Sequence, residues 1–173
     1  IENWDVSNVT DMSNMFRGLG DNFDFNQPLE KWNVSKVKNM AGMFFLAKAF
    51  NQPLNKWNVS NVTNMGRMFS YAQKFNQPLE KWDVSEVEYM DSMFLYAEAF
   101  NQPLEKWDFS NANAYYMTSM FENAENYEVK YLIPLLKSFD SKIIKSMLNE
   151  RQYNNFLKEI AKNKINKKLR EKY

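Results

Sequence analysis

Apolar residues recur along this chain in one pattern with a period of about 25 residues. The alternation of Trp32 and Val34 is typical of a short strand with one face turned inward. The steps of three and four that follow, from Val37 to Ala47, predict an amphipathic helix of about three turns. A fixed period of this length predicts a solenoid in which each unit stacks on its neighbours. One period of the repeat shows these apolar positions: Leu29, Trp32, Val34, Val37, Met40, Met43, Phe44, Ala47, Phe50.

Polar residues also fall in register from unit to unit. A Ser column lies between the predicted strand and helix, where a Ser side chain is a good helix N-cap: Ser7, Ser35, Ser60, Ser85, Ser110. The Phe-Asn-Gln-Pro segments predict extended returns because Pro fixes φ and lacks an amide donor. Their Asn side chains are expected to form a ladder of hydrogen bonds to neighbouring units: Asn26, Asn51, Asn76, Asn101.

The tryptophans occupy one column of the repeat: Trp4, Trp32, Trp57, Trp82, Trp107. Since the amphipathic spacing on both sides of this column agrees with an inward position, we expect it to form a stacked core ladder. The alternative is an aromatic platform for sugars or bases. The methionines at two helix positions, such as Met40 and Met43, are likewise expected to fill the core.

The predicted organisation is a repeat solenoid of about five units over residues 1–127, followed by a helical, basic cap over residues 128–173. Apolar clusters predict helices after Tyr127 and place Pro134 at a helix start or break. Either Asp140 or Ser141 could cap the next helix. The first region holds 10 Lys/Arg against 16 Asp/Glu, and the second 12 against 5. The helices contain these apolar positions: Leu132, Ile133, Leu135, Leu136, Phe139, Ile143, Ile144, Met147, Leu148, Tyr153, Phe156, Leu157, Ile160, Ile165.

The repeat text resembles a known bacterial family over residues 1–124. The shared text is Trp-[Asn/Asp]-Val-Ser-x-Val-x-x-Met-x-x-Met-Phe-x-x-Ala with Phe-Asn-Gln-Pro-Leu. It is similar to the BspA-like, mycoplasma-type surface repeats, a leucine-rich-repeat-related domain of unknown function. The resemblance implies an α/β, right-handed, leucine-rich-repeat-like solenoid with one short strand and one short helix per unit. It also implies a cell-surface or lipoprotein setting with adhesion roles, and no catalytic residues.

Polar residues of the predicted strand form the candidate partner-binding surface. They would line one face at a spacing of ~4.8 Å between strands. Such a face suits a glycan or a host-protein segment, and the alternative is a merely solvated surface. Two columns make up this candidate site: Lys31, Lys56, Lys81, Lys106 and Asn33, Asn58, Asp83, Asp108.

Composition narrows the chemistry. The chain contains neither Cys nor His, which excludes thiolate metal sites and catalysis by Ser–His or Cys–His pairs. Asp83 and Asp108 could imitate a glycosidase carboxylate pair, but Lys81 and Lys106 beside them favour ordinary ionised carboxylates. We expect no enzyme activity, no metal and no cofactor.

The expected function is a non-enzymatic binding module of a bacterial surface protein, with a host extracellular protein or a glycan as partner. The alternative is a structural spacer or self-assembly segment of a larger surface protein. No apolar run reaches the ~18 residues of a membrane span. We expect a cell-surface or extracellular location, with lipid anchoring through a segment before Ile1. We expect no nucleic-acid partner, because a solvated helix end explains the C-terminal basic residues: Lys158, Lys162, Lys164, Lys167, Lys168, Arg170, Lys172.

Overall fold

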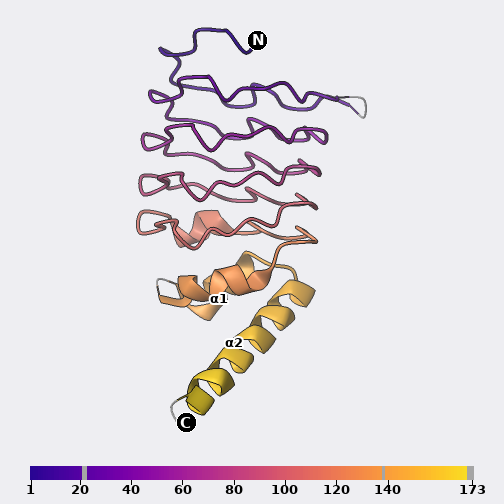
Figure 1. Ribbon diagram of the computed structural model, residues 1–173, viewed down its shortest axis with the longest axis vertical. Helices are drawn as coiled ribbons and strands as arrows, with labels where there is room; N and C mark the ends of the chain where they lie inside the picture. Colours follow the sequence, from indigo (N-terminus) through magenta and orange to yellow (C-terminus); the bar gives the residue numbers. More distant parts are fainter. Residues whose placement is uncertain (21–22, 138, 171–173) are drawn as a thin grey trace.

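The computed structural model describes residues 1–20, 23–137 and 139–170. Each repeat unit forms one irregular coil, and the coils stack along the long axis of the molecule (Figure 1). We number the coils along the chain: coil 1 (1–24), coil 2 (25–49), coil 3 (50–74), coil 4 (75–99), coil 5 (100–124). The helical elements are η1 (Ala114–Met117), a 3-10 turn within coil 5, then η2 (Val129–Lys137), α1 (Ser141–Ser146) and α2 (Glu150–Arg170).

The predicted strand and helix of each unit are absent from the described part of coils 1 to 4. Their only ladder pairings are isolated parallel bridges, which join Asp11 to Asn39, Asn39 to Asn64 and Asn64 to Tyr89. No strand or sheet is formed by the described residues, and their helices begin only at η1. The predicted α/β, leucine-rich-repeat-like solenoid with a strand and a helix per unit is therefore wrong.

The hydrogen bonds explain why the spacing of three and four does not produce a helix. Within coil 2, some amides donate to the carbonyl three residues earlier, as Val37 to Val34 at 2.9 Å and Met43 to Met40 at 3.1 Å. Other amides leave the coil, as Met40 to the Asn64 carbonyl of coil 3 at 2.9 Å. An α-helix needs bonds to the fourth residue back. Successive turns and cross-coil bonds use those amides instead, while keeping the same apolar spacing.

Two columns of the coils adopt left-handed φ angles, mostly in residues other than Gly. An L-residue in this conformation costs roughly 1–2 kcal/mol. Hydrogen bonds between neighbouring coils hold the backbone in this conformation. The Arg67 amide donates to the Asp91 carbonyl at 2.8 Å, and the Tyr71 amide donates to the Leu95 carbonyl at 2.7 Å. The columns are Asn14, Gly42, Arg67, Ser92, Ser119 and Leu46, Tyr71, Tyr96, Asn123.

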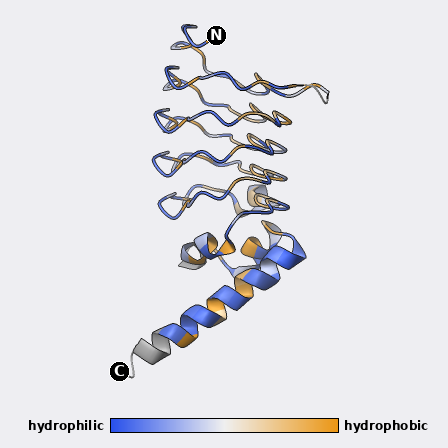
Figure 2. Ribbon diagram, turned by 45° about the vertical axis from the view of Figure 1, so that its right-hand side comes forward, coloured by the Kyte–Doolittle hydropathy of each residue, from blue (hydrophilic) through white to orange (hydrophobic). Residues whose placement is uncertain are grey.

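The interior of the stack consists of ladders of like side chains. Trp57 and Trp82 stack at 6.5 Å between ring centroids, and Phe44 and Phe69 at 5.6 Å. The indole of Trp57 also donates to the Leu29 carbonyl at 3.0 Å, which satisfies its buried N–H. Hydrophobic positions are interspersed with hydrophilic ones along every coil (Figure 2). The core prediction is confirmed for four tryptophans: Trp32, Trp57, Trp82, Trp107.

Trp4 departs from that prediction. It is 56% exposed, although it stacks on Trp32 at 6.4 Å. Among the described residues only coil 2 stacks on its ring, whereas the Trp57 ring lies between Phe44 of coil 2 and Trp82 of coil 4. The methionines follow this rule only in part: Met40 and Met43 are fully buried and Met15 of coil 1 is exposed, but Met12 of coil 1 is buried.

The predicted Asn ladder is confirmed. The side-chain oxygen of Asn26 accepts from the Asn51 amide at 2.9 Å, and that of Asn51 accepts from the Asn76 amide at 2.9 Å. Asn76 accepts from Asn101 in the same way, and Asn101 from Glu128 at 3.0 Å. Each rung satisfies one backbone donor at the start of the next coil.

The C-terminal helices pack on coil 5. Amides of Ser119 and Phe121 donate to the Ser146 and Met147 carbonyls at 2.7 and 2.9 Å, and these carbonyls lie at the end of α1. Asp140 is the N-cap of α1, accepting from the Lys142 and Ile143 amides at 2.8 and 3.0 Å, as one of the two sequence alternatives predicts. The division into regions 1–127 and 128–173 stays a prediction.

The helix α2 begins beside the stack and extends away from it (Figure 1). Phe156 near its start is fully buried, and Ile165 near its end is 59% exposed. Pro134 lies inside η2. No described helix is long and apolar enough to span a membrane. Several side chains of the predicted apolar and basic sets lie outside the described ones: Leu135, Leu136, Lys167, Lys168, Arg170, Lys172.

Candidate partner-binding surface

The eight residues predicted to bind a partner are all exposed. They flank the buried Trp column, since each Lys immediately precedes a Trp and each Asn or Asp follows it. The stacking of Trp57 on Trp82 and of Trp82 on Trp107, both at 6.5 Å, puts their neighbours in register as well. The structure therefore places the two predicted columns beside each other on the surface of irregular coils, and not on strands.

The Lys column is partly tied to the preceding coil. Lys31 forms an ion pair with Glu2 at 2.9 Å, and Lys56 with Glu30 at 3.3 Å. No carboxylate among the described residues lies within ion-pair distance of Lys81 or Lys106. Because these pairs are exposed, each contributes little to stability, typically 0–1 kcal/mol. The ammonium groups thus remain accessible to a partner.

The Asn and Asp column shapes its own backbone. Asn33 Oδ1 accepts from the Ser35 amide at 3.2 Å and from the Ser35 hydroxyl at 2.7 Å. Asp83 and Ser85 repeat this turn at 3.1 and 2.7 Å. The predicted Ser N-caps are therefore wrong: no helix follows in the described part of coils 1 to 4, and the Ser side chain donates instead of accepting. One oxygen of each Asn or Asp faces inward to the turn, and the other polar atom is left for a partner.

The electrostatics of Asp83 argue against acid catalysis. Hydrogen bonds from the Ser85 side chain and then from its backbone amide hold the pKa of Asp83 below its ordinary value. A general acid needs the opposite, a raised pKa. The glycosidase alternative gains no support, and among the described residues no three acidic side chains lie close enough to hold a metal ion.

A small polar hollow lies between coils 4 and 5, outside the predicted columns. Its volume is about 330 Å³, and it is lined by Glu86, Glu88, Tyr89, Asn111, Asn113 and Tyr116. Tyr89 and Tyr116 lie 4.5 Å apart between ring centroids. Neither the carboxylates nor the aromatic rings belong to the sets singled out in the sequence.

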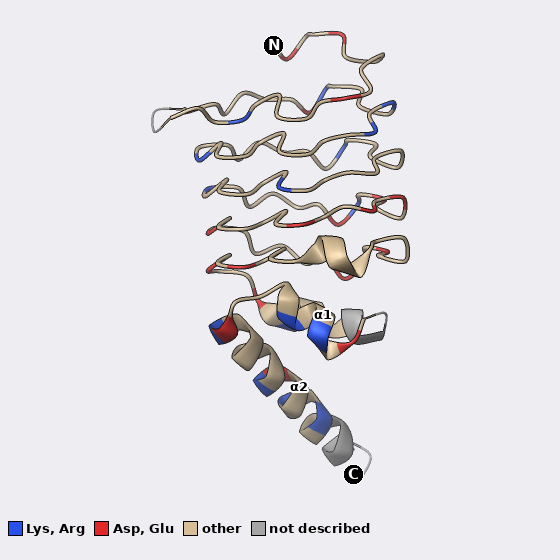
Figure 3. Cartoon of the chain, turned by 180° about the vertical axis from the view of Figure 1, so that it is seen from behind, with Lys and Arg blue, Asp and Glu red and all other residues tan. Residues whose placement is uncertain are grey.

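One feature of the sequence could have drawn attention to Glu86 and Glu88. Basic and acidic residues are segregated along the stack. Residues 25–74 carry seven Lys or Arg and one Asp or Glu, and residues 75–124 carry two and nine. Figure 3 shows the Lys and Arg positions, in blue, concentrated in the middle coils and many of the Asp and Glu positions, in red, in the coils nearer α1. The net charge of residues 1–127 does not reveal this difference, because the basic excess of residues 25–74 nearly cancels the acidic excess of residues 75–124.

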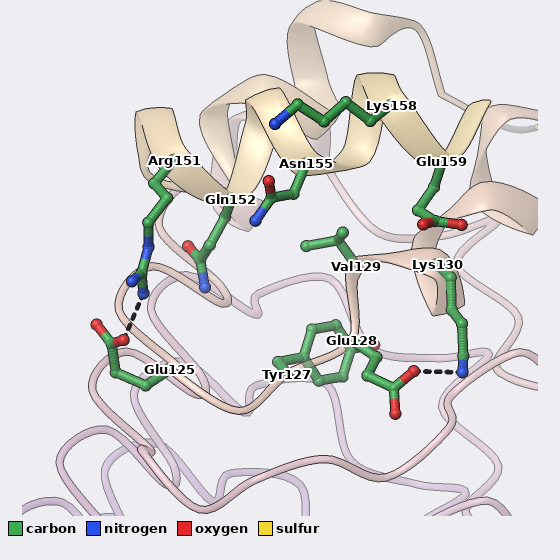
Figure 4. Close-up of a pocket in the computed structure, with 10 residues that line it drawn as sticks. All are labelled: Glu125, Tyr127, Glu128, Val129, Lys130, Arg151, Gln152, Asn155, Lys158 and Glu159. Carbon is green, nitrogen blue, oxygen red and sulfur yellow. Dashed lines mark hydrogen bonds and ion pairs between the residues drawn. The ribbon is translucent and has the colours of Figure 1, made fainter. Parts of the chain in front are cut away.

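A second hollow, of about 450 Å³, lies between α2 and residues 125–130, which follow coil 5. Figure 4 shows that charged groups around it pair with each other, Arg151 with Glu125 and Lys130 with Glu128. Gln152 is buried and donates to the Phe121 and Ala124 carbonyls at 2.9 and 3.1 Å. The Arg151 ion pair and the Gln152 hydrogen bonds attach α2 to the end of the stack. Together with the Lys130–Glu128 pair, they leave few charged groups free for a ligand.

Comparison with known proteins places the chain in a family. A family model described as a Mycoplasma protein of unknown function, DUF285, matches residues 1–79, 17–133 and 57–163. No curated protein and no solved structure matches. The overlapping matches run through both the coils and the start of α2, so the chain belongs to this family of Mycoplasma proteins of unknown function.

Proposed function

We propose that this chain is a non-enzymatic binding module of a bacterial surface protein, which adheres to a host protein or a glycan through the two columns beside the Trp ladder. The Lys column supplies the cations: Lys31, Lys56, Lys81, Lys106. The second column supplies amides and carboxylates: Asn33, Asn58, Asp83, Asp108.

One observation carries the proposal: the exposed columns are repeated in register on a rigid interior. Trp57 and Trp82 beneath them are only 3% exposed, and each indole is fixed by a hydrogen bond of 3.0 Å. The Asn and Asp side chains are fixed by their own turns. A pre-organised surface loses less conformational freedom on binding, which favours affinity.

The chemistry of the columns indicates the class of partner. Ammonium groups donate hydrogen bonds, and the amides and carboxylates beside them accept, so a partner with both kinds of group at regular spacing fits best. Sugar hydroxyls and the backbone of an extended peptide both meet this requirement.

The location forms part of the same proposal. The repeat text supports the finer assignment to BspA-like surface repeats, and with it a cell-surface or extracellular setting with lipid anchoring. Family membership supports the coarser statement that the protein is bacterial.

The test is a binding screen of residues 1–173 against a glycan array and a panel of extracellular-matrix proteins at physiological salt. A saturable partner should bind at least about tenfold more weakly after Lys56→Glu with Lys81→Glu. The matched control is Lys48→Glu with Lys74→Glu, which changes the net charge equally at a separate hollow. Unchanged affinity of the Lys56 and Lys81 variant would contradict the assignment of this surface.

One observation favours the alternative function, a structural spacer or self-assembly segment. The segregation of charge between residues 25–74 and 75–124 gives the stack a basic and an acidic part. Such a molecule can attract a second copy of itself. Light scattering over a range of protein concentrations separates the two functions, because only self-assembly raises the mass with concentration.

A further inference from the structure

Two neighbouring columns of surface side chains change sign along the stack. One column reads Lys36, Asn61, Glu86 and the other Lys38, Thr63, Glu88 in coils 2, 3 and 4. Backbone bonds establish their register: the Thr63 amide donates to the Lys38 carbonyl at 2.9 Å, and the Glu88 amide to the Thr63 carbonyl at 2.9 Å. The surface therefore presents two cations, then two neutral residues, then two carboxylates.

These four charged side chains are accessible. Lys36, Lys38, Glu86 and Glu88 are all exposed. Lys36 donates to the Asn8 side-chain oxygen at 2.7 Å, but none of the four forms an ion pair with another described residue. Glu86 and Glu88 also line the polar hollow between coils 4 and 5. Asp5 is the carboxylate whose pKa the Lys36 charge helps to lower. All four charged groups nevertheless remain exposed and available to a partner.

The order of charges is self-complementary under one symmetry operation. A two-fold axis perpendicular to the stack, passing near Asn61 and Thr63, exchanges coil 2 with coil 4. It brings the lysines of one copy opposite the glutamates of the other, twice in the same interface. A parallel arrangement would place lysine opposite lysine, which is repulsive.

We propose that a second copy of this chain docks on this face, side by side and antiparallel, with Lys36 and Lys38 facing Glu86 and Glu88 of the other copy. A different partner would need the inverse order of charges at the spacing of the coils. A second copy carries that order already. The proposal rests on the alternative function, self-assembly, and names its surface. It does not depend on the adhesion columns.

Charge reversal tests the pairing directly. Sedimentation velocity of the full chain at physiological salt is expected to show a monomer–dimer equilibrium. Lys36→Glu with Lys38→Glu should weaken dimerisation at least about tenfold, and so should Glu86→Lys with Glu88→Lys. Mixing these two variants in equal amounts should restore a dimer, because one face is then wholly acidic and the other wholly basic. Raising the salt to about 0.5 M should dissociate it.

Two outcomes would overturn the proposal in distinguishable ways. A chain that stays monomeric at all concentrations would exclude this face and self-assembly together. A dimer that survives both reversals would exclude this face alone. The control is Lys48→Glu with Lys74→Glu, which should leave the dimer unchanged. Adhesion to an extracellular ligand by a monomeric chain would leave the binding function standing.

Discussion

Coils 2 and 3 and coils 4 and 5 share an interior and differ on the outside. Phe44 and Phe94 each stack on the Phe six residues later, at 3.9 and 4.0 Å. The Trp57 and Trp82 indoles each donate at 3.0 Å to a Leu carbonyl of the preceding coil. Yet the first pair of coils is strongly basic and the second strongly acidic.

This difference separates the residues that fold the chain from those that determine its partners. The interior repeats because each coil must match the ladders of its neighbours. Surface charge makes no such demand, since exposed substitutions usually change stability by less than about 0.5 kcal/mol. Charge can therefore vary between coils of the same shape, and its order along the stack carries information about binding.

The largest expected effect comes from the interior. Phe69→Ala and Phe94→Ala should each lower the free energy of unfolding by about 3–5 kcal/mol, because both rings are fully buried in the same ladder. Urea denaturation measures both values, and Leu variants repeat the comparison if the Ala variants do not fold. Losses that differ by more than about 1 kcal/mol would break the equivalence of the two halves.

The Asn ladder should give the next largest effect. Asn51 accepts from the Asn76 amide at 2.9 Å, and Asn76 accepts from the Asn101 amide at 2.9 Å. Asn51→Ala and Asn76→Ala should each cost about 1–3 kcal/mol, since a backbone donor loses its partner. Asn51→Asp keeps the acceptor oxygen and serves as the control. Ala variants as stable as the parent chain in thermal denaturation would show that water replaces the rung.

The left-handed positions allow a gain in stability in either half. Arg67 and Ser92 occupy one column with φ of 57° and 53°. Arg67→Gly and Ser92→Gly should each stabilise the chain by about 1 kcal/mol, because Gly adopts this conformation without the steric cost. Ser92→Ala keeps the Cβ and should give no gain. Destabilisation by both Gly variants in urea would mean that the side chains contribute more than the strain costs.

The smallest effect is a pH dependence at Asp83, in the acidic coils 4 and 5. The pKa of Asp83 is lowered in the folded chain, mainly by hydrogen bonds from Ser85. The turn that Asp83 forms therefore contributes its full stabilisation of the folded chain above the ordinary carboxyl pKa. This contribution is lost as the pH falls through the lowered pKa that Asp83 has in the folded chain. Between about pH 4 and pH 2, Asp83→Asn should lose less stability than the parent chain. Asn58 forms the same turn with Ser60 and does not titrate, so Asn at position 83 should preserve the turn. Identical dependence of stability on pH in the variant and the parent chain would contradict the role of the Asp83 carboxylate.

Which residues are buried could largely be predicted from the sequence, because burial depends mainly on the apolar pattern. That pattern places Trp57, Met65 and Phe69 in the core, and the structure agrees. Secondary structure could not be predicted in the same way. Successive turns bonded three residues back also produce apolar steps of three, so the pattern does not distinguish turns from a helix.

Hydrogen bonds between coils decide whether a unit forms turns or a helix. These bonds depend on the neighbouring coil, so the sequence of a single unit gives little sign of them. One trace existed: the column that contains Arg67 also contains Asn14 and Gly42, residue types that tolerate left-handed φ. For the site, exposure of the Lys and Asn columns was predictable. The face formed by Lys38 and Glu88 was not recognised, because its signal lies in the differences between units and not in their shared text.

One measurement tests directly the claim that surface charge is independent of the fold but determines the partner. The variant exchanges both sets of charges, with Lys36→Glu, Lys38→Glu, Glu86→Lys and Glu88→Lys in one chain. Its free energy of unfolding should stay within about 0.5 kcal/mol of the parent. In sedimentation velocity it should dimerise like the parent, because the exchanged face is again self-complementary. A folded variant that remains monomeric while the parent dimerises, or one that fails to fold, would contradict the account.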